Sequence, residues 1–296
     1  MKISSFAALQ LPEDMATKSP QKAPATAAFS LIGNDKLQQM YVAMLKCRIL
    51  DSHLRQFSQS SSLKGKEAAF VASTIDLRPE DAVVDASGGA LASFLKGMPL
   101  HSLPGRAHTR KGKQSTAKRQ AAVSAGEAAE CAIATGVAYA RRPGNPENLT
   151  VAFLSSNPAS SEAARRALLF AGAQKLPIIY VYTGREALDV STIASLGFPV
   201  IPVDGKDVVA VYRVMFEGAV RARRGNGPSI IACDFSASGS RRDPIRNMQT
   251  YLSAKGLFHA EKKLPELNAF EKEIKHAANA LNSATISPES RNIFFV

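Results

Sequence analysis

The chain has 296 residues, 45% of them hydrophobic and 21% charged, which is typical of a globular protein with one large α/β domain or two small ones. No apolar run reaches the roughly 18 residues that cross a bilayer, so we exclude a transmembrane protein. The net charge of +12 would suit nucleic acid, but no aromatic residues interleave with the basic clusters at 106–119, 221–224 and 241–246. We therefore disfavour nucleic acid and expect a solvated basic face, or one that docks an acidic protein.

Two compositional features concern the cellular setting and the domain boundary. The three cysteines, Cys47, Cys131 and Cys233, lack metal-type spacing and predict buried free thiols in a reducing cytoplasm. Residues 1–30 are rich in Ala, Pro, Lys and Ser and have no apolar core of a secretory signal, so they predict a disordered arm. We expect residues 31–296 to form one domain that ends in a helical tail.

The domain begins with two predicted helices and a strand. Apolar residues recur at helical spacing over 35–57, and a second helix follows over 66–75. Residues 82–85 are a short apolar run that predicts a strand. The segment Ser87-Gly-Gly-Ala90 is expected to start another helix.

A basic loop and a helix of small residues come next. The stretch 101–119 is polar and has no periodicity, so we expect a mobile loop. Residues 121–141 predict a helix that is interrupted by Gly126 and Gly136. Small residues on such a helix suit close contact with a sheet or with another subunit.

The central part of the chain is the most regular. It predicts a strand over 151–154, a turn over 155–158, a helix over 163–175 and a strand over 178–181. Ser160 or Ser161 can cap the helix, and Pro177 ends it. This βαβ unit requires a parallel sheet with a right-handed crossover. Ligands of such sheets bind at the carboxyl ends of the strands, so the loop 155–158 is the predicted ligand site.

Further strands and helices alternate towards the end of the chain. They are predicted as a strand over 199–203, a helix over 208–223 that Asp207 caps, a strand over 229–233 and helices over 245–255 and 267–281. Asp204-Gly205 is expected to be a structural turn. This alternation favours an α/β fold, a doubly wound parallel sheet with helices on both faces.

Several segments resemble the α subunit of the thiamine-diphosphate-dependent first component of 2-oxo acid dehydrogenase complexes. They are LQQMYVAMLKCRILD at 37–51, KGKEAAFVASTIDLRPEDAVV at 64–84, AIATGVAYARR at 132–142, KLPIIYV at 175–181, VDGKDVVAVYRVMFEGAVRARRGNGPSII at 203–231 and DPIRNMQTYLSAKGL at 243–257. The resemblance covers roughly residues 31–296. It implies a thiamine-diphosphate-binding fold, thiamine diphosphate and magnesium as cofactors, and a β-type subunit in an α2β2-like assembly, with a homodimer as the alternative.

The departures from the family pattern lie at the cofactor motifs. Where the family has Gly-Asp-Gly, with the Asp on magnesium, this chain has Ser155, Ser156 and Asn157. Where the family has an Asn metal ligand, Arg185 follows Gly184. The Tyr-Arg-x-His-Gly segment of the family is replaced at 87–90, and its Gly-His-Ser loop is shortened at 238–240. Because Mg²⁺ prefers anionic oxygen, these aligned positions predict a cofactor site that is impaired, or one in which Arg185 binds phosphate directly.

The remaining polar residues do not form a catalytic motif. His53, His101 and His108 are expected to be solvated or at an interface, while Glu127 and Glu130 are expected to contact a partner subunit or a cofactor. Ser124 and Ser155 have no His and Asp companions at triad spacing, so a hydrolase is not supported. Two function classes therefore compete: a subunit for oxidative decarboxylation of a 2-oxo acid, and a non-catalytic pseudoenzyme that acts as scaffold or regulator.

Overall fold

The computed structural model describes residues 32–57, 63–85, 90–100, 121–124, 129–158, 161–184, 186, 188, 191, 193, 196–235 and 243–284. The predicted arm at 1–30 and the predicted loop at 101–119 lie outside these residues, and so does Arg185. No helix among the described residues is long and apolar enough to span a bilayer.

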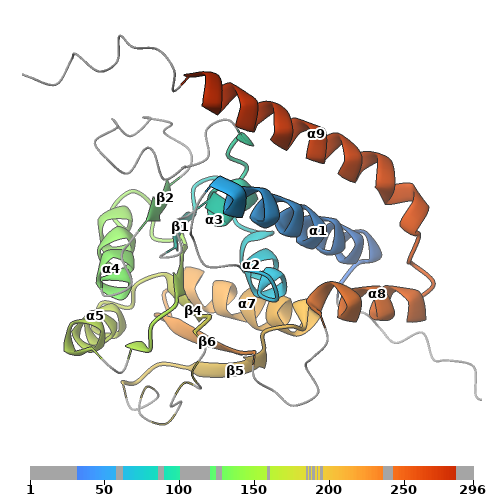
Figure 1. Ribbon diagram of the computed structural model, residues 1–296. Coiled ribbons are helices and arrows are strands. Elements are labelled where there is room, and N and C mark those ends of the chain that lie inside the picture. The colour runs from blue at the N-terminus through green and yellow to red at the C-terminus, as the bar shows by residue number, and fades with distance from the viewer. Residues whose placement is uncertain are drawn as a thin grey trace, which may run out of the picture. The chain divides into compact units, whose positions relative to one another are not determined.

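A parallel sheet of six strands forms the centre of the described chain (Figure 1). The strands are β1 (Ala82–Asp85), β2 (Ala121–Ser124), β3 (Thr150–Leu154), β4 (Ile178–Tyr182), β5 (Val200–Asp204) and β6 (Ser229–Asp234). Their order across the sheet is β2-β1-β3-β4-β6-β5, and every neighbouring pair is parallel. Strands β3 and β4 are buried along their whole length, as their continuous apolar sequences predict. The predicted α/β fold is therefore confirmed.

Helices cover both faces of the sheet (Figure 1). The described helices are α1 (Asn34–Phe57), α2 (Glu67–Thr74), α3 (Ala90–Leu95), α4 (Glu130–Arg141), α5 (Glu162–Ala173), α7 (Val208–Arg223), α8 (Pro244–Ala254) and α9 (Ala260–Ala284), of which α9 packs on α1. Helices α4 and α5 pack on one face, where Ala134 and Leu168 meet Tyr180 of β4 in the core. On the other face, Phe70 of α2 stacks on Phe153 of β3 with ring centroids 4.1 Å apart.

Side chains at the starts of α5 and α7 explain where those helices begin. The Ser161 hydroxyl accepts a hydrogen bond from the Ala164 N–H of α5, as predicted. Asp207 accepts two N–H groups, from Val209 and Ala210 of α7, which was also predicted. Such caps satisfy donors that the helix itself leaves unpaired.

The prediction of one helix over 121–141 was wrong. Residues 121–124 form β2, which pairs in register with β1, and α4 begins only at Glu130. Pairing with β1 outweighs the helix propensity of a short Ala-rich segment, because propensity is a weak local preference. The last helix also begins earlier than predicted, at Ala260, with Pro265 inside it.

Candidate functional site

The order of the strands places the point where the chain direction diverges between β1 and β3. The chain continues from β1 to β2 on one side and from β3 to β4 on the other, so the loops after β1 and β3 diverge. In parallel α/β sheets this topological switch point, at the carboxyl ends of the strands, is where ligands bind. Ser155, Ser156 and Asn157 follow β3 directly, so the predicted ligand loop lies at this position.

A carboxylate from α4 occupies the hydrogen-bond donors of that loop. The Ser155 N–H donates to Glu130 Oε1 at 2.9 Å and to Oε2 at 3.1 Å, and the Ser156 N–H donates to Oε1 at 2.8 Å. The Ser155 hydroxyl completes the set with Oε2 at 3.1 Å. Glu130 is only 3% exposed, although it is the first residue of its helix. The loop that follows β3 is therefore tied to α4 through this one side chain.

A second buried carboxylate ends β1 at the same edge of the sheet. Asp85 is 2% exposed, and it stands in register with Phe153 of β3 and with Ser124 of β2. The sequence reasoning did not single out Asp85, and it assigned Glu130 to a contact with a partner or a cofactor. Asp85 could have been found from the sequence, because it is an acid at the end of an apolar strand and that strand borders the switch point. Two acids at this edge make it unfavourable for an anion that arrives without a cation.

The segment after β4 closes over Tyr182. The Tyr182 hydroxyl donates to the Glu186 carbonyl at 2.9 Å, and Lys66 Nζ donates to the Thr183 carbonyl at 2.6 Å. Burial, with the charges of Glu186 and Glu130, raises the pKa of Tyr182 above its ordinary value. A Cβ at Gly184 would lie 2.1 Å from the Tyr182 hydroxyl oxygen, so only glycine fits there. Direct phosphate binding by Arg185, which lies outside the described residues, remains a prediction.

Comparison with known proteins decides the family. Residues 36–235 match the family model described as dehydrogenase E1 component, which is more than half of the chain. The chain belongs to the dehydrogenase E1 family. It is 29% identical over 269 residues to the 3-methyl-2-oxobutanoate dehydrogenase subunit alpha of Mycobacterium tuberculosis, covering 76% of this chain and 72% of that one. It is also 24% identical over 287 residues to the pyruvate dehydrogenase E1 component subunit alpha of Staphylococcus epidermidis, covering 82% and 77%.

The E1 family depends on thiamine diphosphate, and the loop after β3 in this chain contains no carboxylate among its described residues 155–158. Within the described ranges no three side chains of Asp, Glu, His or Cys gather into a metal-binding group. The loop itself offers two serines and an asparagine. The nearby Glu130 carboxylate already accepts from three donor groups, the Ser155 N–H, the Ser156 N–H and the Ser155 hydroxyl, which engage most of the roughly four lone-pair sites of a carboxylate.

The other sequence-predicted candidates separate into two groups. Asp204-Gly205 is a structural turn, as predicted: the Gly205 N–H donates to the Asp234 carbonyl at 2.9 Å, and the Lys206 N–H donates to Asp204 Oδ1 at 2.9 Å. His101, His108, Glu127 and the segments 87–89 and 238–240 lie outside the described residues. His53 lies on α1, and its buried Nδ1 has no hydrogen-bond partner in the described part of the chain.

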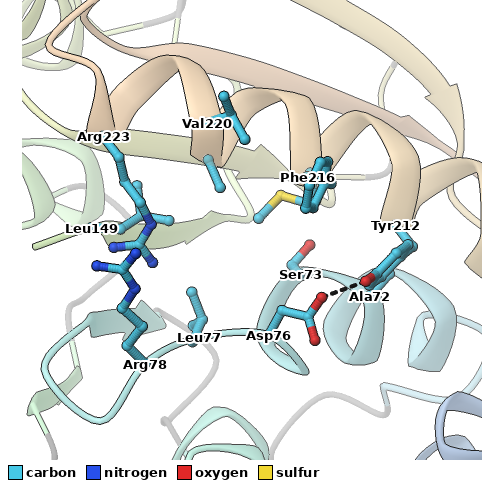
Figure 2. Close-up of a pocket in the computed structure, with 12 residues that line it drawn as sticks. Ala72, Ser73, Asp76, Leu77, Arg78, Leu149, Tyr212, Phe216, Val220 and Arg223 are labelled. Atoms are coloured by element: carbon cyan, nitrogen blue, oxygen red, sulfur yellow. Dashed lines mark hydrogen bonds between the residues drawn. The ribbon is translucent and has the colours of Figure 1, made fainter. Parts of the chain in front are cut away.

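A separate cavity of about 240 Å³ lies between α2 and α7 (Figure 2). Its base is apolar and includes Leu149 and Met215, and the Tyr212 hydroxyl donates to Asp76 at one end. Arg78 and Arg223 stand at the other end (Figure 2). Leu149 directly precedes β3, so the cavity is at the amino edge of the sheet, opposite the loop that carries Ser155.

Proposed function

We propose that this E1-family chain is an α-type subunit of a 2-oxo acid dehydrogenase-like assembly and does not itself bind magnesium and thiamine diphosphate. It acts there as a non-catalytic scaffold or regulatory subunit. The observation that carries this proposal is the Glu130 carboxylate on the N–H groups of Ser155 and Ser156. The cofactor motif of the family aligns with this loop, and the donors that it offers are already engaged.

An apolar face on α4 and α5 supports a partner subunit. Tyr139 is 51% exposed and Phe170 43% exposed, and their rings meet edge to face with centroids 5.4 Å apart. Leu169 and Gly136 are also exposed, and a Cβ at Gly136 would have no atom within 4 Å. Contiguous exposed apolar residues are characteristic of interaction surfaces. Because the relatives named above are alpha subunits, we assign this face to a β-type subunit, with a second copy of this chain as the alternative.

Calorimetric titration of thiamine diphosphate tests the cofactor half of the proposal. The full chain is titrated with and without Mg²⁺, alone and together with a co-expressed β-type subunit. We expect no saturable heat in any of the four experiments. Micromolar binding that requires Mg²⁺ would overturn the proposal and favour an active subunit whose metal ligands include Asp85 or residues outside the described ranges. Metal-independent binding would instead assign a phosphate contact to Arg185.

A further inference from the structure

We propose that Glu130 is a built-in anion: its carboxylate fills an anion-binding site in the loop after β3 and thereby closes that site to phosphate-type ligands. This inference rests on the proposed function, because it states what stands in the position of the cofactor's diphosphate. The juxtaposition that carries it is the buried Glu130 carboxylate against the N–H groups of Ser155 and Ser156.

The donors have the arrangement of an anion site. The N–H groups of two successive residues, Ser155 and Ser156, converge on the same oxygen, Oε1 of Glu130, and such paired amides form a concave nest for anions. The nest lies at the switch point of the sheet, where ligands of this fold class bind. Helix α5 begins six residues after Ser156 at Glu162, with Ser161 as its cap, so its amino end is engaged separately.

Glu130 has the properties of the missing ligand. Its carboxylate supplies a negative charge and two coplanar oxygens, and it fills the nest with three N–H contacts and one O–H contact. Burial, and then the charge of Glu130, raises the pKa of the neighbouring Cys131 thiol to about 12, so that no competing anion forms there. A neutral glutamine would tie α4 to the loop without the cost of burying a charge. A charged residue is favoured at a position that is built to receive an anion.

An external phosphate group cannot share this position. It would find the N–H groups of Ser155 and Ser156 already engaged by Glu130, and it would approach an edge of the sheet at which the Glu130 and Asp85 carboxyl groups are buried. Removal of the Glu130 carboxylate frees the N–H groups of Ser155 and Ser156. It also removes one of the two acids at this edge of the sheet. The expected result is a gain of anion binding, which a purely structural role for Glu130 does not produce.

The experiment compares pyrophosphate binding by the full chain and three variants. Inorganic pyrophosphate is titrated calorimetrically at low ionic strength, without metal, into the wild type, Glu130→Ala, Glu130→Gln and Glu162→Gln. We expect no saturable binding by the wild type and at least about tenfold tighter binding by Glu130→Ala, where tenfold corresponds to about 1.4 kcal/mol. Glu130→Gln should lie between them, because its amide oxygen still accepts one N–H. Glu162→Gln is the matched control, since this exposed acid begins the neighbouring helix α5 and, among the described residues, its ion pairs are with Arg165 and Arg166.

Several outcomes would overturn the inference. Equal pyrophosphate affinity for the wild type and both folded Glu130 variants, or an equal gain in Glu162→Gln, would show that Glu130 blocks no anion site. Loss of cooperative unfolding in Glu130→Gln would show that the carboxylate is a structural anchor. The assay uses the chain without a partner, so failure to find a β-type subunit leaves it unaffected. Conversely, a wild type that binds magnesium and thiamine diphosphate refutes the proposed function whatever the Glu130 variants do.

Discussion

Replacement of Asp81 by Asn should destabilise the fold more than any exposed charge change near it. Asp81 is fully buried between α2 and β1. Its carboxylate accepts both terminal nitrogens of Arg223, at 3.0 and 2.5 Å, and the N–H groups of Arg78 and Leu149, at 2.7 and 2.9 Å. This one side chain therefore joins the end of α7, the turn before β1 and the start of β3.

The magnitude follows from what the substitution leaves behind. In Asp81→Asn the amide N–H₂ opposes the Arg223 guanidinium, and the charge of that largely buried guanidinium loses its counterion. Breaking a buried ion pair by removing one partner costs about 3–5 kcal/mol. For a domain of this size each kcal/mol lowers the melting temperature by about 2–4 °C, so the expected decrease is about 6–20 °C.

The assay is thermal and urea unfolding followed by circular dichroism, with Glu147→Gln as the control. Glu147 pairs with Arg78 through side chains that are both more than half exposed, and its carbonyl still accepts Arg223 after the change. An exposed pair contributes at most about 1 kcal/mol. The double variant Asp81→Asn with Arg223→Met should lose less unfolding free energy than the two single variants lose together, because no uncompensated charge remains. Equal melting temperatures for Asp81→Asn and Glu147→Gln would refute the reasoning.

Three further predictions concern the thiols, acid stability and assembly. Burial raises the pKa of the Cys47 thiol, and it raises the pKa of the Cys131 and Cys233 thiols to about 12, so all three thiols stay protonated at pH 8. A disulfide reagent should therefore label them only in denaturant. Fast labelling of the native chain would contradict this expectation. Burial alone would raise the pKa of Asp243, but hydrogen bonds from Arg48 and the Ile245 N–H hold it below the ordinary 3.8. A depressed pKa stabilises the fold above the ordinary value, and this contribution is lost as the pH falls through the folded value. Asp243→Asn should therefore be less stable than the wild type at pH 7, with a gap that closes below pH 3.8 and that a pH series of urea midpoints measures; a gap independent of pH would count against it. Gly136→Leu should leave the melting temperature of the chain unchanged, because a Cβ there meets no atom, and should abolish co-elution with a β-type subunit in gel filtration; unchanged co-elution would refute the assigned face.

The sequence predicted the parts of the fold that depend on local signals. The unit β3–α5–β4 combines two apolar runs, a helix with Ser161 as its cap and a Pro at 177, so its elements and their parallel pairing follow from the chain itself. Strand β2 has no comparable signal. Its four residues, 121–124, form a strand because they pair with the edge of β1. Strand β1 is about 40 residues earlier in the chain, so the local sequence of β2 does not predict this pairing.

The candidate site likewise combines a part that local sequence predicts with a part that depends on contacts between distant residues. The loop at Ser155, Ser156 and Asn157 was located from the strand before it and from the family motif. The sequence did not predict that Glu130 binds this loop, because Glu130 is 25 residues before Ser155 and lies on α4, ahead of β3. No spacing rule joins a helix's first residue to a loop beyond the next strand. Only the packing of α4 against β3 brings them together.

The substitution in the loop and the presence of Glu130 belong together in electrostatic terms. Ser156→Asp, which restores the family's acid, would place a third carboxylate beside Glu130 and Asp85 while the N–H groups of the loop remain engaged. Repulsion between like charges opposes that single change. We therefore expect Ser156→Asp alone to gain no pyrophosphate binding with Mg²⁺, and Ser156→Asp with Glu130→Gln to gain it. If the single change suffices, the carboxylate of Glu130 is a ligand that accommodates a metal, and the site needs only one residue to recover.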